Sequence, residues 1–285
     1  MKKLIFNLAT IISVSLLIFT SCDLQDETDG TSFQNFEIED ETVAESTFDD
    51  IDDVVMQEMA NIQGSSSRTS ATLSRDYSIC LDTVIHDVDN QTITLDFGDD
   101  DCLAPDGRER KGKIIIAYSG GRWYEIGSTR IITFENYTVD GNLVEATRTK
   151  TTIANDTSDY HTVQTSLTNG KITFVDGSFI TRASNFVNVW VRATNPANDQ
   201  LIHTGSASGT TMASVSYNTN ITTPIVFKRS CRSARVFIPV SGIKIQTWDN
   251  NERFVNYGDG TCDNLVTITF NGNTREVEVN RRRRG

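Results

Sequence analysis

The residues whose types could support catalysis or metal binding are few and widely spaced. The chain has three histidines, His86, His161 and His203, and none has a partner at the spacing of metal ligands. We therefore interpret each histidine as a residue on a strand surface rather than as a ligand or base. No phosphate-binding loop, dinucleotide fingerprint or zinc pattern occurs. The sequence thus assigns no catalytic residue and no cofactor, and it predicts a protein that is not an enzyme.

One short segment superficially resembles the turn that carries a nucleophilic serine in hydrolases. It is Gly205–Gly209, which reads Gly-Ser-Ala-Ser-Gly. The nucleophile of such a turn is its central residue, and here that residue is Ala207. We interpret the segment as a small-residue turn or bulge between strands.

Acidic turns suggest calcium as a ligand, because carboxylates and loop carbonyls suit a hard cation. The candidate calcium ligands are Asp99, Asp101, Asp106 and Asp259. Their spacing departs from that of a calcium-binding helix–loop–helix, so solvated turn aspartates are the alternative interpretation. Any chain this acidic contains carboxylate pairs of the kind used in glycoside hydrolysis, so their presence does not distinguish an enzyme from a non-enzymatic protein.

Two aromatic residues are candidates for contact with a ligand such as a glycan. Trp123 and Tyr124 follow the Gly120-Gly121 turn, which would expose them at a hairpin tip. The alternative is that these side chains belong to the core, as most aromatic side chains do.

The first residues of the chain predict export and lipid anchoring. Lys2 and Lys3 precede an apolar run that is too short and too polar for a convincing spanning helix, so residues 1–21 form a signal peptide. Phe19-Thr20-Ser21-Cys22 resembles the bacterial lipoprotein box, with Phe in place of the usual Leu. The resemblance implies that Cys22 becomes the acylated (palmitate-bearing) N-terminus. The membrane is then a partner of the protein through this lipid.

The remaining four cysteines form two similar brackets. Cys80 and Cys102 enclose a segment with the turn Phe-Gly-Asp, and Cys231 and Cys262 enclose one with Tyr-Gly-Asp. Four cysteines allow three pairings, of which Cys80–Cys102 and Cys231–Cys262 is the most economical. Such disulfides require an oxidising compartment, which agrees with export.

The net charge of −12 comes from one part of the chain. Between Asp23 and Ala60 there are fourteen Asp or Glu and no Lys or Arg, while the rest of the mature chain is balanced. We predict an acidic disordered tether over residues 22–40 and a basic tail over 281–285, where Arg281 to Arg284 occur. A balanced body has no basic face, so we expect no nucleic-acid partner.

Apolar residues recur at three- and four-residue spacing after the tether, in Ala44, Phe48, Ile51, Val55 and Met59. This period predicts an amphipathic helix over residues 41–64, with its acidic residues on the opposite face. A Ser-rich linker over 65–75 follows.

Alternating patterns then run through residues 76–280 and predict a β domain. Strand-like runs rich in Val, Ile and Thr are separated by turn signals such as Asp140-Gly141, Asn169-Gly170 and Asn271-Gly272. The predicted fold class is mainly β, either an antiparallel sandwich or a strongly curled sheet of ten or more strands. The amphipathic helix is expected to pack on one face of it.

The chain resembles a group of uncharacterised envelope lipoproteins of the Bacteroidetes. The resemblance rests on the two cysteine brackets, on Arg110-Lys111-Gly112-Lys113 and on Asp259–Asn264. The resemblance implies a large, mostly β protein at the outer membrane, on the cell surface or the periplasmic face, and implies no activity. We expect a non-enzymatic binding, adhesion or assembly module with a glycan or envelope protein as partner. The alternatives are a carrier of an apolar ligand between helix and curled sheet, and a carbohydrate-active enzyme.

Overall fold

The computed structural model describes residues 38–63, 80–104, 107–156, 160–234, 236 and 238–279. These residues form one helix, a 14-stranded sheet and two short 3-10 helices. The signal peptide, Cys22, most of the predicted tether, the 65–75 linker and Arg281 to Arg284 lie outside the described residues. The strands in chain order are β1 (Thr83–Asp87), β2 (Thr92–Asp96), β3 (Cys102–Leu103), β4 (Glu109–Ser119), β5 (Thr129–Val139), β6 (Asn142–Asp156), β7 (Tyr160–Thr173), β8 (Phe179–Val191), β9 (Gln200–Thr210), β10 (Ser216–Lys228), β11 (Ser241–Trp248), β12 (Asn251–Asp259), β13 (Leu265–Phe270) and β14 (Asn273–Glu278).

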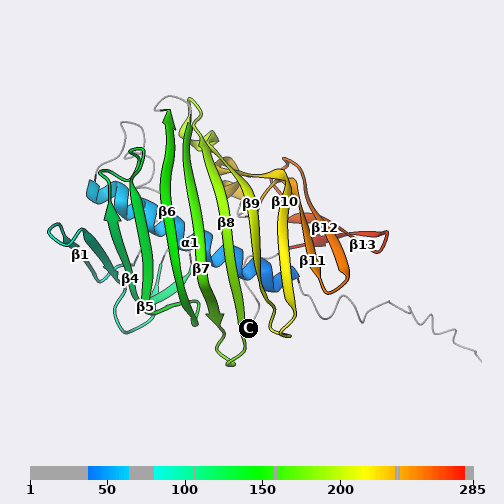
Figure 1. The fold of residues 1–285 in the computed structure, drawn as a ribbon, viewed down its shortest axis with the longest axis horizontal. Helices are drawn as coiled ribbons and strands as arrows, with labels where there is room; N and C mark the ends of the chain where they lie inside the picture. The colour runs from blue at the N-terminus through cyan, green and yellow to red at the C-terminus, as the bar shows by residue number, and fades with distance from the viewer. Residues whose placement is uncertain are drawn as a thin grey trace, which may run out of the picture.

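The sheet is an antiparallel meander in which spatial order follows chain order (Figure 1). Each strand from β4 to β14 pairs with its sequence neighbours, and β3 alone lies off this path, paired with β4. The two edge strands, β1 and β14, do not pair with each other, so the sheet is open. The fold is therefore mainly β and antiparallel, as predicted, and of the two predicted forms it is the curled sheet.

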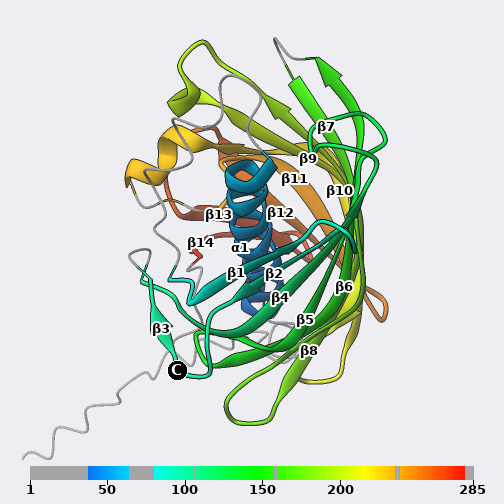
Figure 2. The same ribbon diagram turned by 90° about the vertical axis from the view of Figure 1, so that its left-hand side faces the viewer.

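The sheet curls around a single helix, α1 (Ile38–Gln63), which lies in its hollow (Figure 2). Bulges and glycine kinks provide the bend. Gly205 in β9 and Gly242 in β11 have φ of +129° and +109°. A Cβ at either position would collide with a carbonyl oxygen of the neighbouring strand, that of Asn185 or Pro224. Only glycine permits this close approach, which lets adjacent strands turn toward the helix.

Helix α1 is buried on nearly all sides rather than on one stripe. The predicted apolar stripe is buried as expected, with Phe48, Ile51 and Met59 in the main core. The acidic face, predicted opposite the apolar stripe, is buried as well: Glu41 and Asp50 are buried, and of the α1 side chains described only Asn61 is exposed. A sheet that wraps a helix covers both of its faces, so the acidic face needs partners within the protein.

Cations on the inner face of the sheet are those partners. Asp50 accepts hydrogen bonds of 2.9 and 2.8 Å from Arg110 of β4. Asp52 lies 2.6 Å from both Arg148 and Lys150 of β6. Two further groups complete the row: Arg182 of β8 and Lys244 of β11 both form ion pairs with Glu41 and Glu45. Buried charges require such pairing, and the inner face of the sheet provides it for the acidic residues of α1.

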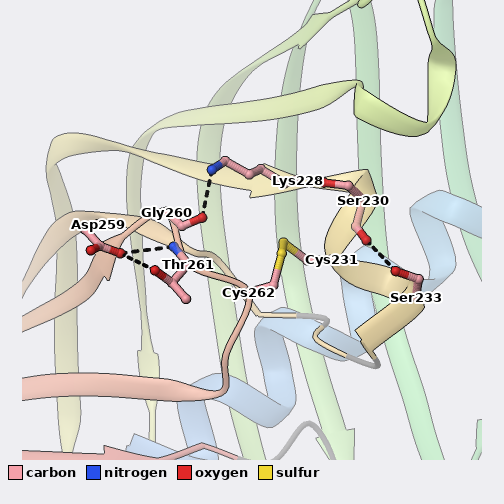
Figure 3. The surroundings of a disulfide bond; sticks show 8 residues. All are labelled: Lys228, Ser230, Cys231, Ser233, Asp259, Gly260, Thr261 and Cys262. Atoms are coloured by element: carbon pink, nitrogen blue, oxygen red, sulfur yellow. Dashed lines mark hydrogen bonds between the residues drawn. A yellow bond between two sulfur atoms is a disulfide. The ribbon is translucent and has the colours of Figure 1, made fainter.

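The two predicted disulfides, Cys80–Cys102 and Cys231–Cys262, are both present. The second joins the 3-10 helix Arg229–Ala234 to the turn after β12 (Figure 3). Lys228 donates to the carbonyl oxygen of Gly260 in that same turn, at 2.7 Å. Closing loops of 22 and 31 residues, the bridges each contribute about 3 kcal/mol by constraining the unfolded chain.

Candidate functional site

A pocket lies between the second half of α1 and the inner face of β7 to β10. Its volume is about 190 Å³. Engineered cavities of about 150 Å³ hold benzene, so this pocket has room for one ring with its substituents.

Strand register builds the sheet side of the pocket as two rows of inward-facing residues. One row is His161, Trp190, Leu201 and Phe227, which are successive register partners across β7, β8, β9 and β10. The second row, two residues away along each strand, begins with Val163, Asn188 and His203. Directly paired residues of a sheet point to the same face, and all seven line the pocket. Each row therefore combines polar and apolar side chains.

Several polar atoms of these rows are buried and have no hydrogen-bond partner among the described residues. They are Nδ1 and Nε2 of His161, Nε2 of His203 and Oδ1 of Asn188. Asn188 is held in place from its other end, because its Nδ2 donates to Thr165 Oγ1 at 3.0 Å. Buried polar atoms are nearly always satisfied in folded proteins, so unsatisfied atoms on three residues that line one pocket favour completion by a ligand or water.

Both pocket histidines are neutral at physiological pH. Burial lowers the pKa of His161 to about 3, and the nearby Arg130 guanidinium adds to the shift. Burial likewise lowers the pKa of His203 to about 4. Each neutral imidazole carries one donor and one acceptor nitrogen, so these rings provide hydrogen-bonding groups of both kinds without a charge.

The helix side of the pocket is acidic, and its carboxylates differ in pKa. Burial, with the Glu45 carboxylate, raises the pKa of Asp49 to about 7. Burial also acts on Asp52, but Arg148 and Lys150 outweigh it and lower the pKa to about 2. Across the whole pocket, four acidic residues face four basic ones. They are Asp49, Asp52, Asp53 and Asp199, and Arg130, Lys150, Lys228 and Arg229.

Trp123 lines the pocket and is only 3% exposed. Of the two interpretations of this residue, the core position is confirmed and the exposed hairpin tip is wrong. The Trp123 carbonyl oxygen accepts hydrogen bonds from Ser128, Arg130 and Thr152, which draw the loop between β4 and β5 inward. The indole ring meets His161 edge-on, with ring centroids 5.4 Å apart. Tyr124, the other predicted ligand contact, is half-buried against Trp123 and is not part of the pocket lining.

The surface interpretation of the histidines is wrong for two of the three. His161 and His203 are 3% and 7% exposed, whereas His86 is exposed on the edge strand β1 and bonds to Tyr118 Oη at 2.7 Å. The burial of His161 could have been predicted from its position in the strand, because it lies an even number of residues from Val163 and Leu167 and so shares their face. The inner face of this sheet carries many polar residues, which made that face hard to recognise from the sequence.

The structure does not bring the candidate calcium ligands together. Asp101 forms an ion pair with Lys111 at 3.5 Å, and Asp259 accepts hydrogen bonds from Thr261 in its own turn. Asp99 is exposed, and Asp106 lies outside the described residues. No cluster of three or more potential metal ligands occurs among the residues that were placed.

No protein family, curated protein or solved structure matches the chain. In the part of the chain that the structure describes, no helix is both long enough and apolar enough to cross a membrane.

Proposed function

We propose that the protein is a lipid-anchored envelope protein that binds a small molecule, without chemical turnover, in the pocket between α1 and the sheet. The observation that carries this proposal is the set of buried, unsatisfied polar atoms on His161, His203 and Asn188, three residues that line a pocket of about 190 Å³. Ligand sites typically combine an apolar wall with a few convergent polar groups, and this pocket has that composition. Acylation of Cys22 would hold the binding domain at the outer membrane.

The mixed wall favours this function over a carrier of a purely apolar ligand. Leu201, Phe227 and Ile238 provide apolar surface. An apolar occupant would bury the free nitrogens of His161 permanently without partners, at a cost of about 1–3 kcal/mol for each such group. A ligand with hydrogen-bonding groups avoids that cost.

Hydrolysis is the second candidate, because Asp49 and Asp52 have pKa values that their surroundings push apart. A raised and a lowered carboxyl pKa in one pocket is the arrangement of a general acid and a nucleophile. Asp52, however, accepts hydrogen bonds from Arg148 on both oxygens, at 2.7 and 2.6 Å. A carboxylate held this way is a poor nucleophile, so binding is the better-supported function.

Saturation-transfer NMR on the full chain tests the proposal directly. The chain is purified in a detergent that contains no sugar and screened with neutral sugars, aliphatic acids, amines and aromatic fragments. We expect at least one class to bind, and Leu201→Trp, which fills the pocket, to weaken that binding at least tenfold. The matched control is Ile131→Trp on the outer face, where Ile131 is 43% exposed.

Three outcomes would contradict the proposal. One is that no class binds. Another is that Leu201→Trp, shown to be folded by circular dichroism, binds as well as the control. The third is release of free sugar from an aryl glycoside at a rate that Asp49→Asn abolishes, which would establish hydrolysis instead.

A further inference from the structure

We propose that the ligand of this pocket is a neutral, hydroxylated six-membered ring of the pyranose type. The inference rests on the proposed binding function and specifies the chemistry of its ligand. Three features of the pocket support it: the charge balance, the types of unsatisfied atoms and the apolar wall.

The charge balance of the pocket disfavours an ionic ligand. Among the cations, Lys150 is paired with Asp52 at 2.6 Å, and Lys228 donates to the neutral carbonyl oxygen of Gly260 at 2.7 Å. The Arg130 guanidinium donates to Trp123 O at 2.8 Å. On the acidic side, Asp52 is paired, and Asp199 accepts hydrogen bonds from Trp190 Nε1 and the Ala193 amide, both at 2.9 Å. The four acidic and four basic side chains of the lining balance in number, so a charged ligand would add an uncompensated charge to the pocket.

The unsatisfied atoms call for a ligand that both donates and accepts. Asn188 Oδ1 only accepts, whereas neutral His161 offers one donor and one acceptor nitrogen. A hydroxyl group is the smallest group that donates and accepts at once. Two or three hydroxyls on one edge of a ring would therefore satisfy His161, Asn188 and His203 in either tautomer.

The placement of the apolar wall suits the C–H face of such a ring. Leu201 and Phe227 continue the row that begins with His161 and Trp190. Apolar side chains of β9 and β10 thus lie beside the polar groups of His161 and Asn188, and His203 adds a polar group on β9. A pyranose has hydroxyls around its edge and C–H groups on its faces, so one molecule can meet both parts of the pocket.

Isothermal titration calorimetry with matched ring compounds tests this inference, using the full chain at pH 7.5 in the same sugar-free detergent. The neutral probes are the methyl glycosides of glucose, galactose and mannose. Glucuronate and glucosamine keep the ring but add a charge, and cyclohexanol keeps the ring size but has a single hydroxyl. We expect at least one neutral glycoside to bind at least tenfold more tightly than all three of these compounds.

Two variants assign the binding to the unsatisfied atoms. His161→Phe and Asn188→Leu should each weaken the glycoside at least tenfold, because each removes a buried hydrogen-bonding partner. The matched control is His86→Phe, which removes an exposed histidine and should change affinity less than twofold. Equal losses in His86→Phe and His161→Phe would overturn the inference.

The outcomes separate this inference from the proposed function. If glucuronate, glucosamine or cyclohexanol binds as tightly as the glycosides, the inference is wrong and the binding function stands. The same conclusion follows if no ring compound binds but the fragment screen finds another class in the pocket. If neither experiment detects binding, both the ligand class and the binding function are wrong.

Discussion

The Asp50 carboxylate shows how the hollow of the sheet accommodates charge. It is 2% exposed, and Arg110 and Arg108 approach it at 2.8 and 3.4 Å. Moving a carboxylate and a guanidinium group from water into the protein interior costs free energy, and their attraction offsets that cost only when the geometry is good. Buried pairs of this kind select one arrangement of helix and sheet more than they add to stability.

Breaking this pair should destabilise the protein far more than breaking an exposed one. Asp50→Ala removes this carboxylate from the buried Arg110 guanidinium, while Arg108 keeps its pair with Asp140 at 3.0 Å, and we expect a loss of about 3–5 kcal/mol in the free energy of unfolding. The control is Glu145→Ala, since Glu145 and Lys171 form an exposed pair whose loss should cost less than about 1 kcal/mol. Urea unfolding measures both values.

A compensating double variant sharpens this test. Asp50→Leu combined with Arg110→Met replaces the pair by apolar groups and should recover most of the lost stability. Equal stability losses in Asp50→Ala and Glu145→Ala would show that the inner pair has no special role.

These residues also mark how far sequence reasoning could go. The period of Phe48, Ile51, Val55 and Met59 predicted the helix, and their burial follows from it. The partners of the acidic residues could not be predicted, because Arg110 lies 60 residues from Asp50 and Lys244 lies 199 residues from Glu45. The same limit hid the pocket, since strand parity places His161 and Asn188 on a face but does not say what covers it.

At the scale of elements, the pKa values of the α1 carboxyl groups depend on the cations of the inner strands. Burial opposes ionisation of Glu45, but Lys244 and Arg182 outweigh it and lower its pKa to about 2, as Asp52 is also lowered. These two acids stabilise the fold above their ordinary pKa of about 4, and this contribution is lost as the pH falls from about 4 to 2. The two pocket histidines affect stability at higher pH. Below a pH of about 6.5 they are protonated in the unfolded chain but not in the folded protein, and this difference favours unfolding.

Asp49 should act in the opposite direction to His161. Its pKa is raised to about 7, so between pH 4 and 7 the folded protein retains a proton that the unfolded chain has lost. Asp49→Asn should therefore lose more stability than the wild type on acidification from pH 7 to 4.5, by at most about 1.4 kcal/mol per pH unit. Urea unfolding across this range gives the slope.

His161→Phe should have the opposite effect on the pH dependence of stability. The pKa of His161 is lowered to about 3, so removing its imidazole should reduce the loss of unfolding free energy between pH 6.5 and 4. If Asp49→Asn and His161→Phe change the pH dependence of the unfolding free energy in the same direction, the pKa shifts assigned to Asp49 and His161 are wrong.

For the whole molecule, the sheet is one open, curled layer with α1 in place of a second sheet. Alternation predicted many antiparallel strands, but it is the same in a sandwich and in a curled sheet, so it left that choice open. The bend depends on glycines such as Gly205 and Gly242, whose backbone geometry no sequence pattern reveals. The predicted anchor at Cys22 would hold this whole unit at the membrane through one covalent bond.

The anchor has a direct test in cells. Cys22→Ser should move the protein from the washed membrane fraction to the soluble fraction and remove the mass of the acyl chains, because each buried methylene contributes about 0.8 kcal/mol to membrane binding. Ser21→Ala, which keeps the cysteine, is the control. Retention of Cys22→Ser in washed membranes would exclude a lipid on this residue as the anchor.

The position of α1 ahead of every strand has a consequence for the order of folding. A chain that emerges from its N-terminal end presents α1 first, and its partners follow 60, 96, 141 and 199 residues later. The meander can form strand by strand meanwhile, since each strand pairs with its neighbour. The acidic side chains would keep this segment soluble until then. The helix would dock from its middle toward its N-terminal end as the successive cations arrive, with Lys244 completing the closure.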